Sequence, residues 1–124
     1  MRKLAFLFCA ALLLAGCGRK STADLVGQLK DRESAQRLRA IKELESRGRD
    51  AGVVVPALAD CLKDDDSFVR RDAAQALGNF GPDGKEAAPA LLLALRDKTP
   101  KVRTAAAEAL KKVDPESAVQ AGVR

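Results

Sequence analysis

The stretch Asp64–Gly81, Asp-Asp-Asp-Ser-Phe-Val-Arg-Arg-Asp-Ala-Ala-Gln-Ala-Leu-Gly-Asn-Phe-Gly, recurs in this chain at a fixed period. Its Val-Arg pair and its Ala-Leu pair return one period later, and Arg and Leu also stand one period earlier: Val69-Arg70 and Val102-Arg103, Ala76-Leu77 and Ala109-Leu110, Arg37 and Leu44. A fixed period of about 33 residues is typical of solenoid proteins, which stack one small structural unit upon the next.

Each period predicts two helices. The first, which we call the A helix, carries small apolar pairs followed by a leucine at helical spacing (Ala40-Ile41 and Leu44, Ala73-Ala74 and Leu77, Ala106-Ala107 and Leu110). The second, the B helix, carries leucines four residues apart, which lie on one face of a helix (25 and 29, 58 and 62, 91 and 95). No β-strand pattern of useful length occurs. The sequence therefore predicts an all-α fold, a short right-handed α-solenoid of about three antiparallel helix pairs.

Glycine and proline predict where these helices begin and end. We expect Gly48, Gly78 and Gly81 to end the A helices, because glycine adopts the left-handed conformation at low cost. We expect Pro56 and Pro89 in the first turns of the B helices, since a proline deeper in a helix removes a hydrogen bond and clashes with the preceding turn. Only 3% of the residues are aromatic, so the core is expected to consist of alanine and leucine.

The first sixteen residues have the organisation of a secretory signal. Arg2-Lys3 precede an apolar run from Leu4 to Leu14, which is too short for a membrane-spanning helix of about 20 residues. The motif Leu14-Ala15-Gly16-Cys17 resembles the bacterial lipobox, which implies cleavage between Gly16 and Cys17 and a lipid on the Cys17 sulfur. The alternative is an ordinary signal peptide in which Cys17 is incidental. We therefore divide the chain into a signal peptide (1–16), a lipidated tether (17–22), a repeat domain (23–113) and a C-terminal tail or incomplete repeat (114–124).

The charge and the amino-acid composition argue against several classes of function. The 124-residue chain carries a net charge of +5, and without residues 1–16 it holds 20 basic and 17 acidic residues, an excess too small to indicate nucleic-acid binding. With Cys9 removed and Cys17 lipidated, Cys61 is left alone and is expected to be a small buried apolar side chain. The chain has no histidine, tryptophan or tyrosine, so most general bases and metal ligands are missing. We expect no catalysis, no metal and no cofactor.

The repeated pattern, Asp-x-x-x-x-Val-Arg-x-x-Ala-Ala-x-Ala-Leu-Gly followed by Pro-Ala-Leu and Leu-Arg-Asp, resembles the short HEAT repeat, and within it the PBS-lyase HEAT-like subtype. The resemblance covers residues 22–113 and is strongest in the second and third units. The first unit departs from it, with Gln36 and Arg47 in place of Val69 and Phe80, as an end unit facing solvent would. The signatures of ankyrin and tetratricopeptide repeats are missing.

The resemblance also assigns a structural role to an acidic and a basic residue in each unit. Asp and Arg recur six residues apart, as Asp31 and Arg37, Asp64 and Arg70, Asp97 and Arg103. In HEAT repeats such a pair joins the end of one helix to the next and forms a hydrogen-bonded ladder along the stack. The alternative is a set of isolated surface ion pairs worth about 0–1 kcal/mol each.

Two groups of residues are candidates for binding a partner. Lys30, Lys63 and Arg96 stand one period apart on the B helices, which we expect to line the concave side as they usually do in HEAT proteins, and they form a basic column suited to an anionic partner. They also suit a purely structural role, as cations at helix C-termini. Leu92 and Leu93 make the last B helix apolar nearly all round, so they are either covered by the tail or part of a binding patch.

The chain is thus expected to be a lipid-anchored, non-catalytic module that binds an unidentified protein partner at the bacterial cell envelope. Gly18 replaces the Asp that holds many Gram-negative lipoproteins at the inner membrane, which favours the outer membrane. Two alternatives remain open, an enzyme or accessory of the bilin-lyase type, after which the subtype is named, and a structural subunit of an envelope complex. Asp114–Val119 resembles a turn into another B helix, and we expect a short helix near 116–122, self-association or a client to cover the last A helix.

Overall fold

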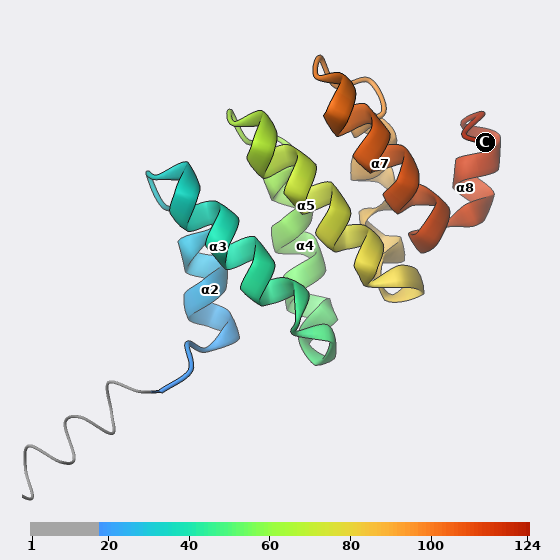
Figure 1. The fold of residues 1–124 in the computed structure, drawn as a ribbon. Coiled ribbons are helices and arrows are strands. Elements are labelled where there is room, and N and C mark those ends of the chain that lie inside the picture. Colours follow the sequence, from blue (N-terminus) through green and yellow to red (C-terminus); the bar gives the residue numbers. More distant parts are fainter. Residues whose placement is uncertain (1–17) are drawn as a thin grey trace, which may run out of the picture.

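The computed structural model describes residues 18–124. The expected signal peptide and Cys17 lie outside the described residues. The described part of the chain forms α-helices and 3-10 helices joined by short turns (Figure 1). In chain order these are α2 (Thr22–Gln28), α3 (Ser34–Glu45), η1 (Gly48–Asp50), α4 (Ala51–Cys61), α5 (Ser67–Asn79), η2 (Gly81–Ala87), α6 (Ala88–Ala94), α7 (Pro100–Val113) and α8 (Pro115–Gln120).

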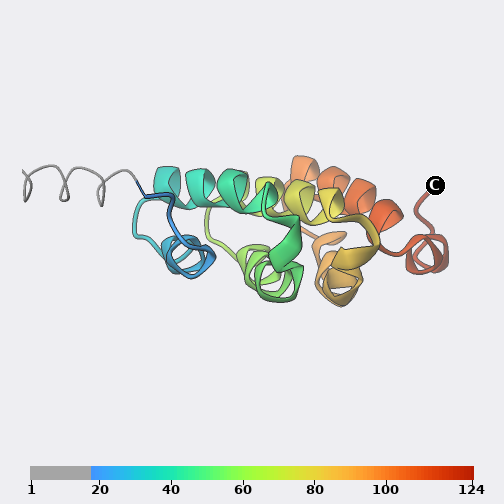
Figure 2. The ribbon, with the colours of Figure 1, turned by 90° about the horizontal axis from the view of Figure 1, so that it is seen from below.

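The helices form two layers, which Figure 2 shows edge-on. The predicted A helices, α3, α5 and α7, make one layer, and the predicted B helices, α2, α4 and α6, make the other. Helices of the two layers alternate along the chain and run antiparallel, so the predicted α-solenoid of three helix pairs is confirmed. None of the helices among residues 18–124 is long and apolar enough to cross a membrane.

The core lies between the two layers and repeats with the sequence. The leucines that recur once per period on the B helices and on the A helices are fully buried (Leu25, Leu58 and Leu91; Leu44, Leu77 and Leu110). Alanines on the A helices, Ala40, Ala73 and Ala106, are also fully buried and let neighbouring helices approach. The expected core of alanine and leucine is therefore present, with valine added at Val54, Val69 and Val102.

The two layers are packed to different extents. In the A layer, α5 contacts α7 along much of its length, and α3 contacts α5 less extensively. In the B layer, α2 and α4 meet at few residues, and the helices are more widely separated. A stack whose helices are closer on one side curves towards that side. The A helices therefore form the inner layer, and the expectation that the B helices line the concave side is wrong.

Two of the expected helix boundaries are also wrong. Pro56 lies well inside α4, which begins five residues before it, because Ala51–Val55 continue the helix from η1 with Val54 and Val55 buried. The hydrogen bond lost at Pro56 would have reached Gly52, which is exposed. Gly78 lies within α5 rather than at its end, where Gly81 takes the left-handed conformation with φ of 58°. Gly48 begins η1, two residues after the Ser46 C-cap of α3.

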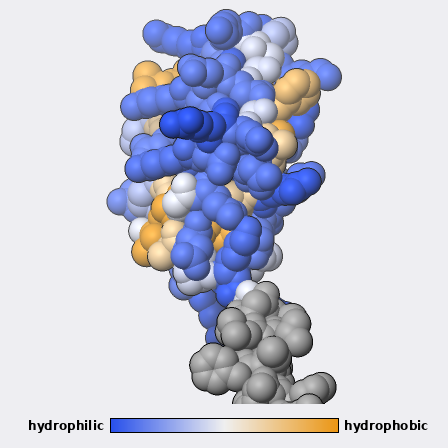
Figure 3. Space-filling view, turned by 90° about the vertical axis from the view of Figure 1, so that its left-hand side faces the viewer, coloured by the Kyte–Doolittle hydropathy of each residue, from blue (hydrophilic) through white to orange (hydrophobic). Residues whose placement is uncertain are grey.

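The two ends of the stack differ. The N-terminal end is mainly hydrophilic, and apolar surface is confined to its flanks (Figure 3). At the other end α8 packs against α7 and buries Ala118, which is 2% exposed. Its N-cap is Asp114, whose carboxylate accepts a hydrogen bond of 2.6 Å from the Ser117 hydroxyl. The short helix expected near 116–122 is therefore present, and it covers part of the last A helix.

Candidate interaction surface

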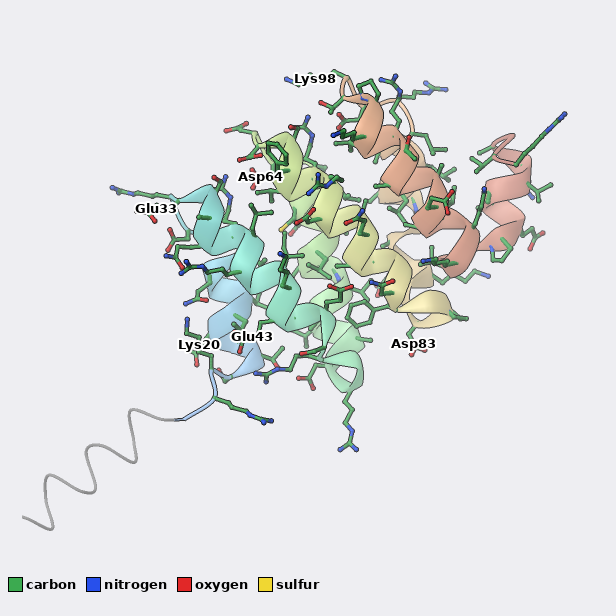
Figure 4. The ribbon with its side chains drawn as sticks, viewed as in Figure 1. Lys20, Glu33, Glu43, Asp64, Asp83 and Lys98 are labelled. Atoms are coloured by element: carbon green, nitrogen blue, oxygen red, sulfur yellow. The ribbon has the colours of Figure 1, made fainter. Side chains whose placement is uncertain are left out.

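The recurring Asp and Arg residues form a connected series along the stack. Arg70 is 5% exposed, and its Nε and Nη2 donate to the two carboxylate oxygens of Asp97 at 2.9 and 3.2 Å. Its Nη1 donates to the backbone carbonyl of Asp64 at 2.7 Å. Asp64 lies in the turn between α4 and α5, which Figure 4 labels. One guanidinium thus joins the two turns that begin successive A helices.

The same arrangement occurs one unit earlier. The Arg37 guanidinium donates to the carbonyl of Asp31 at 2.7 Å and to the carboxylate of Asp64 at 2.9 Å. Arg37 and Arg70 therefore each meet the Asp six residues before them only through the backbone, and the ion-pair partner of each is the Asp 27 residues after it, in the next unit. This pairing differs from the expected one. The carboxylates also accept hydrogen bonds of 2.9 Å from the amides two residues on, those of Glu33, Asp66 and Thr99, which fixes their orientation.

The last arginine of the series has fewer partners. Arg103 Nη1 donates to the carbonyl of Asp97 at 2.8 Å, but its guanidinium meets no carboxylate among residues 18–124. The side chain of Arg103 is exposed, unlike that of Arg70. The contacts of Arg37 and Arg70 hold the stack together, and those of Arg103 close only its own turn.

A groove of about 710 Å³ crosses the inner layer of the solenoid. It is lined by residues of α3, α5 and α7, among them Lys42, Gln75, Lys101, Glu108 and Lys112. Ile41, Ala105 and Ala109 form its floor and are themselves buried, and Gly78 is buried where α5 contacts α7. The groove thus has a floor of buried apolar residues and a polar rim.

The charges of the groove are unevenly paired. Asp72 lies 2.7 Å from Arg71 Nη2 and Glu108 lies 3.8 Å from Lys111 Nζ, whereas Glu45 accepts a hydrogen bond only from the neutral amide of Asn79 and keeps its negative charge. Lys42, Lys101 and Lys112 make no ion pair and no side-chain hydrogen bond within the described part of the chain. These three lysines outnumber Glu45, so the net unbalanced charge of the groove is positive.

The residues expected to bind a partner lie elsewhere. Lys30, Lys63 and Arg96 are exposed on the outer layer, each directly after the C-cap residue of its B helix. Leu92 packs against the core, whereas Leu93 is 71% exposed beside a shallow depression shared with Ala121. The sequence-based expectation missed the groove because it assigned the wrong layer to the concave side. A signal was available, since Lys42, Gln75 and Glu108 stand one period apart and all line the groove.

The described residues include neither a reactive thiol nor a cluster of metal ligands. Cys61 is buried, and burial together with the charges of Asp64 and Asp60 raises the pKa of its thiol to about 11. A thiol with this pKa is a poor nucleophile at neutral pH. Among residues 18–124 no group of three carboxylate or thiol side chains is placed to hold a metal ion. The arrangement can present a surface to another molecule.

Comparison with known proteins agrees with this fold. A family model described as HEAT repeat matches residues 54–83, and one described as HEAT repeats matches residues 69–121. Together they cover residues 54–121 and show that the chain contains HEAT repeats. A search of curated proteins found no significant match.

Solved structures extend the likeness to most of the chain. One similar structure is the complex of CpcE and CpcF of phycocyanin lyase from Nostoc sp. PCC7120, with 26% identity and a TM-score of 0.74. The match covers 84% of this chain and 41% of that one. An engineered protein is also similar, with 23% identity, a TM-score of 0.65, and coverage of 84% of this chain and 52% of that one. This chain thus spans about half the length of these neighbours, or less.

Proposed function

We propose that this chain, which is built of HEAT repeats, is a non-catalytic module that binds another protein through the groove of its inner layer. The observation that carries the proposal is the groove itself, which three successive helices form together. Each helix contributes residues at equivalent positions, so the surface is a direct product of the repeat. Extended concave surfaces of this kind are what stacked helical repeats offer to partners.

Two further features support protein binding over catalysis. The described residues hold no histidine and no activated thiol, so a reaction would have to depend on hydroxyl, amino, guanidinium and carboxylate side chains. The similar chain comes from a structure of the complex of CpcE and CpcF, which is an instance of a similar fold that engages a protein partner.

We further propose that the module is held at a membrane of the bacterial envelope by a lipid on Cys17. The support is the sequence of residues 1–17 alone, with its basic start, short apolar run and lipobox-like motif. Gly18 favours the outer membrane over the inner one. In the described structure α2 begins at Thr22, four residues after Gly18, so the tether would hold the repeats close to the lipid surface.

The proposal is tested by site-specific crosslinking in the native membrane. Gln75 is exposed and lines the middle of the groove, so a photo-crosslinking amino acid in its place reports on what occupies the groove. Asp60 is exposed on the outer layer and provides the matched control position. We expect one protein to crosslink from position 75 and not from position 60, and to be recovered less efficiently from a Cys17→Ala variant. If position 75 gives no protein adduct, or position 60 gives the same adduct, the groove does not bind a protein.

The same experiment addresses the two alternative functions. A structural subunit of a larger complex would give an adduct in fixed stoichiometry that persists after gentle solubilisation. An accessory of the bilin-lyase type is favoured by the similarity to the phycocyanin lyase complex. That function predicts a visible absorption band in the purified protein, or uptake of an added bilin, and neither is expected of a module that binds only protein.

A further inference from the structure

We propose that the partner segment bound in the groove is acidic, with carboxylates at both ends of a helix of about three turns. This inference rests on the proposed function, because it names the chemistry of the segment that the groove would take. It depends on Lys42, Lys101 and Lys112, the three cations of the groove that have no carboxylate within the described part of the chain.

The positions of the lysines define two basic ends. Lys101 lies in the first turn of α7, and Lys112 lies in its last turn. Eleven residues of α-helix separate them, which corresponds to about 16 Å along the axis. Lys42 lies in the last turn of α3, on the opposite side of the groove from α7. The apolar side chains of Ile41, Ala105 and Ala109 lie in the same groove.

Structural needs of the helices do not account for Lys101. Lysines at the end of a helix interact favourably with its dipole, which explains Lys42 and Lys112 in part. Lys101 stands at the opposite end, where the dipole disfavours a cation, and Ala35 and Phe68 occupy the equivalent positions of the other units. A cation placed against the dipole and without a partner in the described chain is explained by a carboxylate that arrives with a ligand.

The groove's own carboxylates have other contacts in the structure. Asp72 is paired with Arg71, and Glu45 accepts a hydrogen bond from the Asn79 amide. The stem of Lys112 lies beside α5, with its Cδ 3.6 Å from the site of a Cβ on Gly78, and the residue lines the groove.

Two labelled helical peptides, each one turn longer than the segment between Lys101 and Lys112, provide a defined test. Both are amphipathic helices of alanine and leucine; one carries Glu at two positions eleven residues apart and the other carries Lys there. We expect the Glu peptide to bind the full repeat domain at least about tenfold more tightly than the Lys peptide, as measured by fluorescence anisotropy. The double variant Lys101→Glu with Lys112→Glu should reverse that preference.

A charge-matched variant separates specific binding from attraction to a basic protein. Lys30→Glu with Lys63→Glu makes the same change in net charge on the outer layer, and it should leave the preference unchanged. The inference is overturned if the Glu peptide binds no more tightly than the Lys peptide, which includes the case that neither binds at about 1 mM. It is also overturned if the outer variant weakens binding as much as the groove variant does. Thermal unfolding of each variant checks that it is folded.

Crosslinking distinguishes this inference from the proposed function. If the native adduct from position 75 persists in the Lys101→Glu, Lys112→Glu variant, the groove binds a protein but not through an acidic segment. If the adduct is lost in that variant and retained in the outer variant, both proposals stand. If wild-type protein gives no adduct from position 75, the proposed function fails irrespective of the peptide result.

Discussion

Gly78 determines how closely two helices of the inner layer approach. A Cβ added there would lie 3.0 Å from the Ala109 Cα and 3.2 Å from its Cβ, so α5 and α7 would have to move apart. The equivalent residues in the other units are Glu45 and Lys111, and α3 packs less closely on α5 than α5 does on α7. The absence of a side chain at Gly78 thus permits the close approach of α5 and α7.

We predict that Gly78→Ala lowers the free energy of unfolding by about 1–3 kcal/mol, because overpacking outweighs the gain in helix propensity. Urea denaturation followed by circular dichroism measures the change. Gly27→Ala is the matched control, since Gly27 lies in α2 with no atom within 4 Å of its Cβ site, and it should stabilise by about 0.5–1 kcal/mol. Equal effects of the two substitutions would show that the approach of α5 and α7 is not limiting.

The three ladder arginines should differ in their contribution to stability. Arg70→Ala leaves the carboxylate of Asp97 and the carbonyl of Asp64 without their partner in a buried site, and we predict a loss of about 3–5 kcal/mol. Arg103→Ala removes exposed hydrogen bonds to two carbonyls, and we predict less than about 1 kcal/mol. Chemical denaturation at neutral pH measures both. Similar losses would mean that the ion pair with Asp97 adds nothing.

The pKa of Asp97 makes part of this stability pH-dependent. Burial alone raises the pKa of Asp97, but hydrogen bonds from Arg70 and from the Thr99 amide, together with neighbouring positive charge, hold it below its ordinary value. The unfolded chain therefore binds more protons, and stability falls as the pH drops below about 4. We predict that Asp97→Asn is less stable than wild type at pH 7 but loses less stability on acidification. A parallel decline in the two proteins, measured by urea titration between neutral and acidic pH, would contradict this.

At the scale of the helices, the sequence period predicts which face of each helix is buried, but it does not predict where every helix begins. The buried face of each B helix was predicted correctly from the leucine that recurs once per period, at Leu25, Leu58 and Leu91. The same residue recurs because the equivalent position is buried in every unit. The start of α4 was not predicted, since Val54 and Val55 correspond to the polar Ser21 and Thr22 in the first unit, and in the third unit η2 replaces the first turn of the helix. Pro56 then lies inside the helix because hydrophobic burial of Val54 and Val55 outweighs one lost hydrogen bond.

The packing of α8 on α7 depends on one small side chain. Ala118 is 2% exposed, whereas the adjacent Val119 is 75% exposed. We predict that Ala118→Asp detaches α8, because a carboxylate cannot be buried without a partner, and that amide exchange within α8 becomes faster by at least about tenfold. Val119→Asp adds the same charge on the solvent side and should leave exchange unchanged. Equal exchange in the two variants, measured by hydrogen–deuterium exchange, would show that α8 does not depend on this contact.

At the scale of the whole molecule, the stacking of units was predictable and its curvature was not. Identical positions recur once per period whichever layer is inside, so the sequence does not state which helices converge. That property depends on residues such as Gly78, whose counterparts Glu45 and Lys111 differ from it. The groove was missed for the same reason. The period does predict the exposed column of Lys30, Lys63 and Arg96, but it does not indicate that this column lies on the outer layer.

A stack of units that contact only their neighbours should open first where those contacts are weakest. α3 is joined to the rest by a less extensive contact with α5 and by the pair of Arg37 with Asp64, whereas α5 and α7 are packed closely around Gly78. We therefore predict that amides of α2 and α3 exchange at a lower opening free energy than those of α5 and α7, as measured by native-state hydrogen exchange.

Arg37→Ala tests the cause of this difference. It removes the ion pair that joins the first unit to the second, so exchange in α2 and α3 should accelerate while exchange in α7 is unaffected. Arg103→Ala, at the other end of the ladder, serves as the control and should leave α2 and α3 unchanged. If Arg37→Ala instead accelerates exchange in all helices to the same extent, the solenoid unfolds as a single cooperative unit and the ladder is a global rather than a local tie.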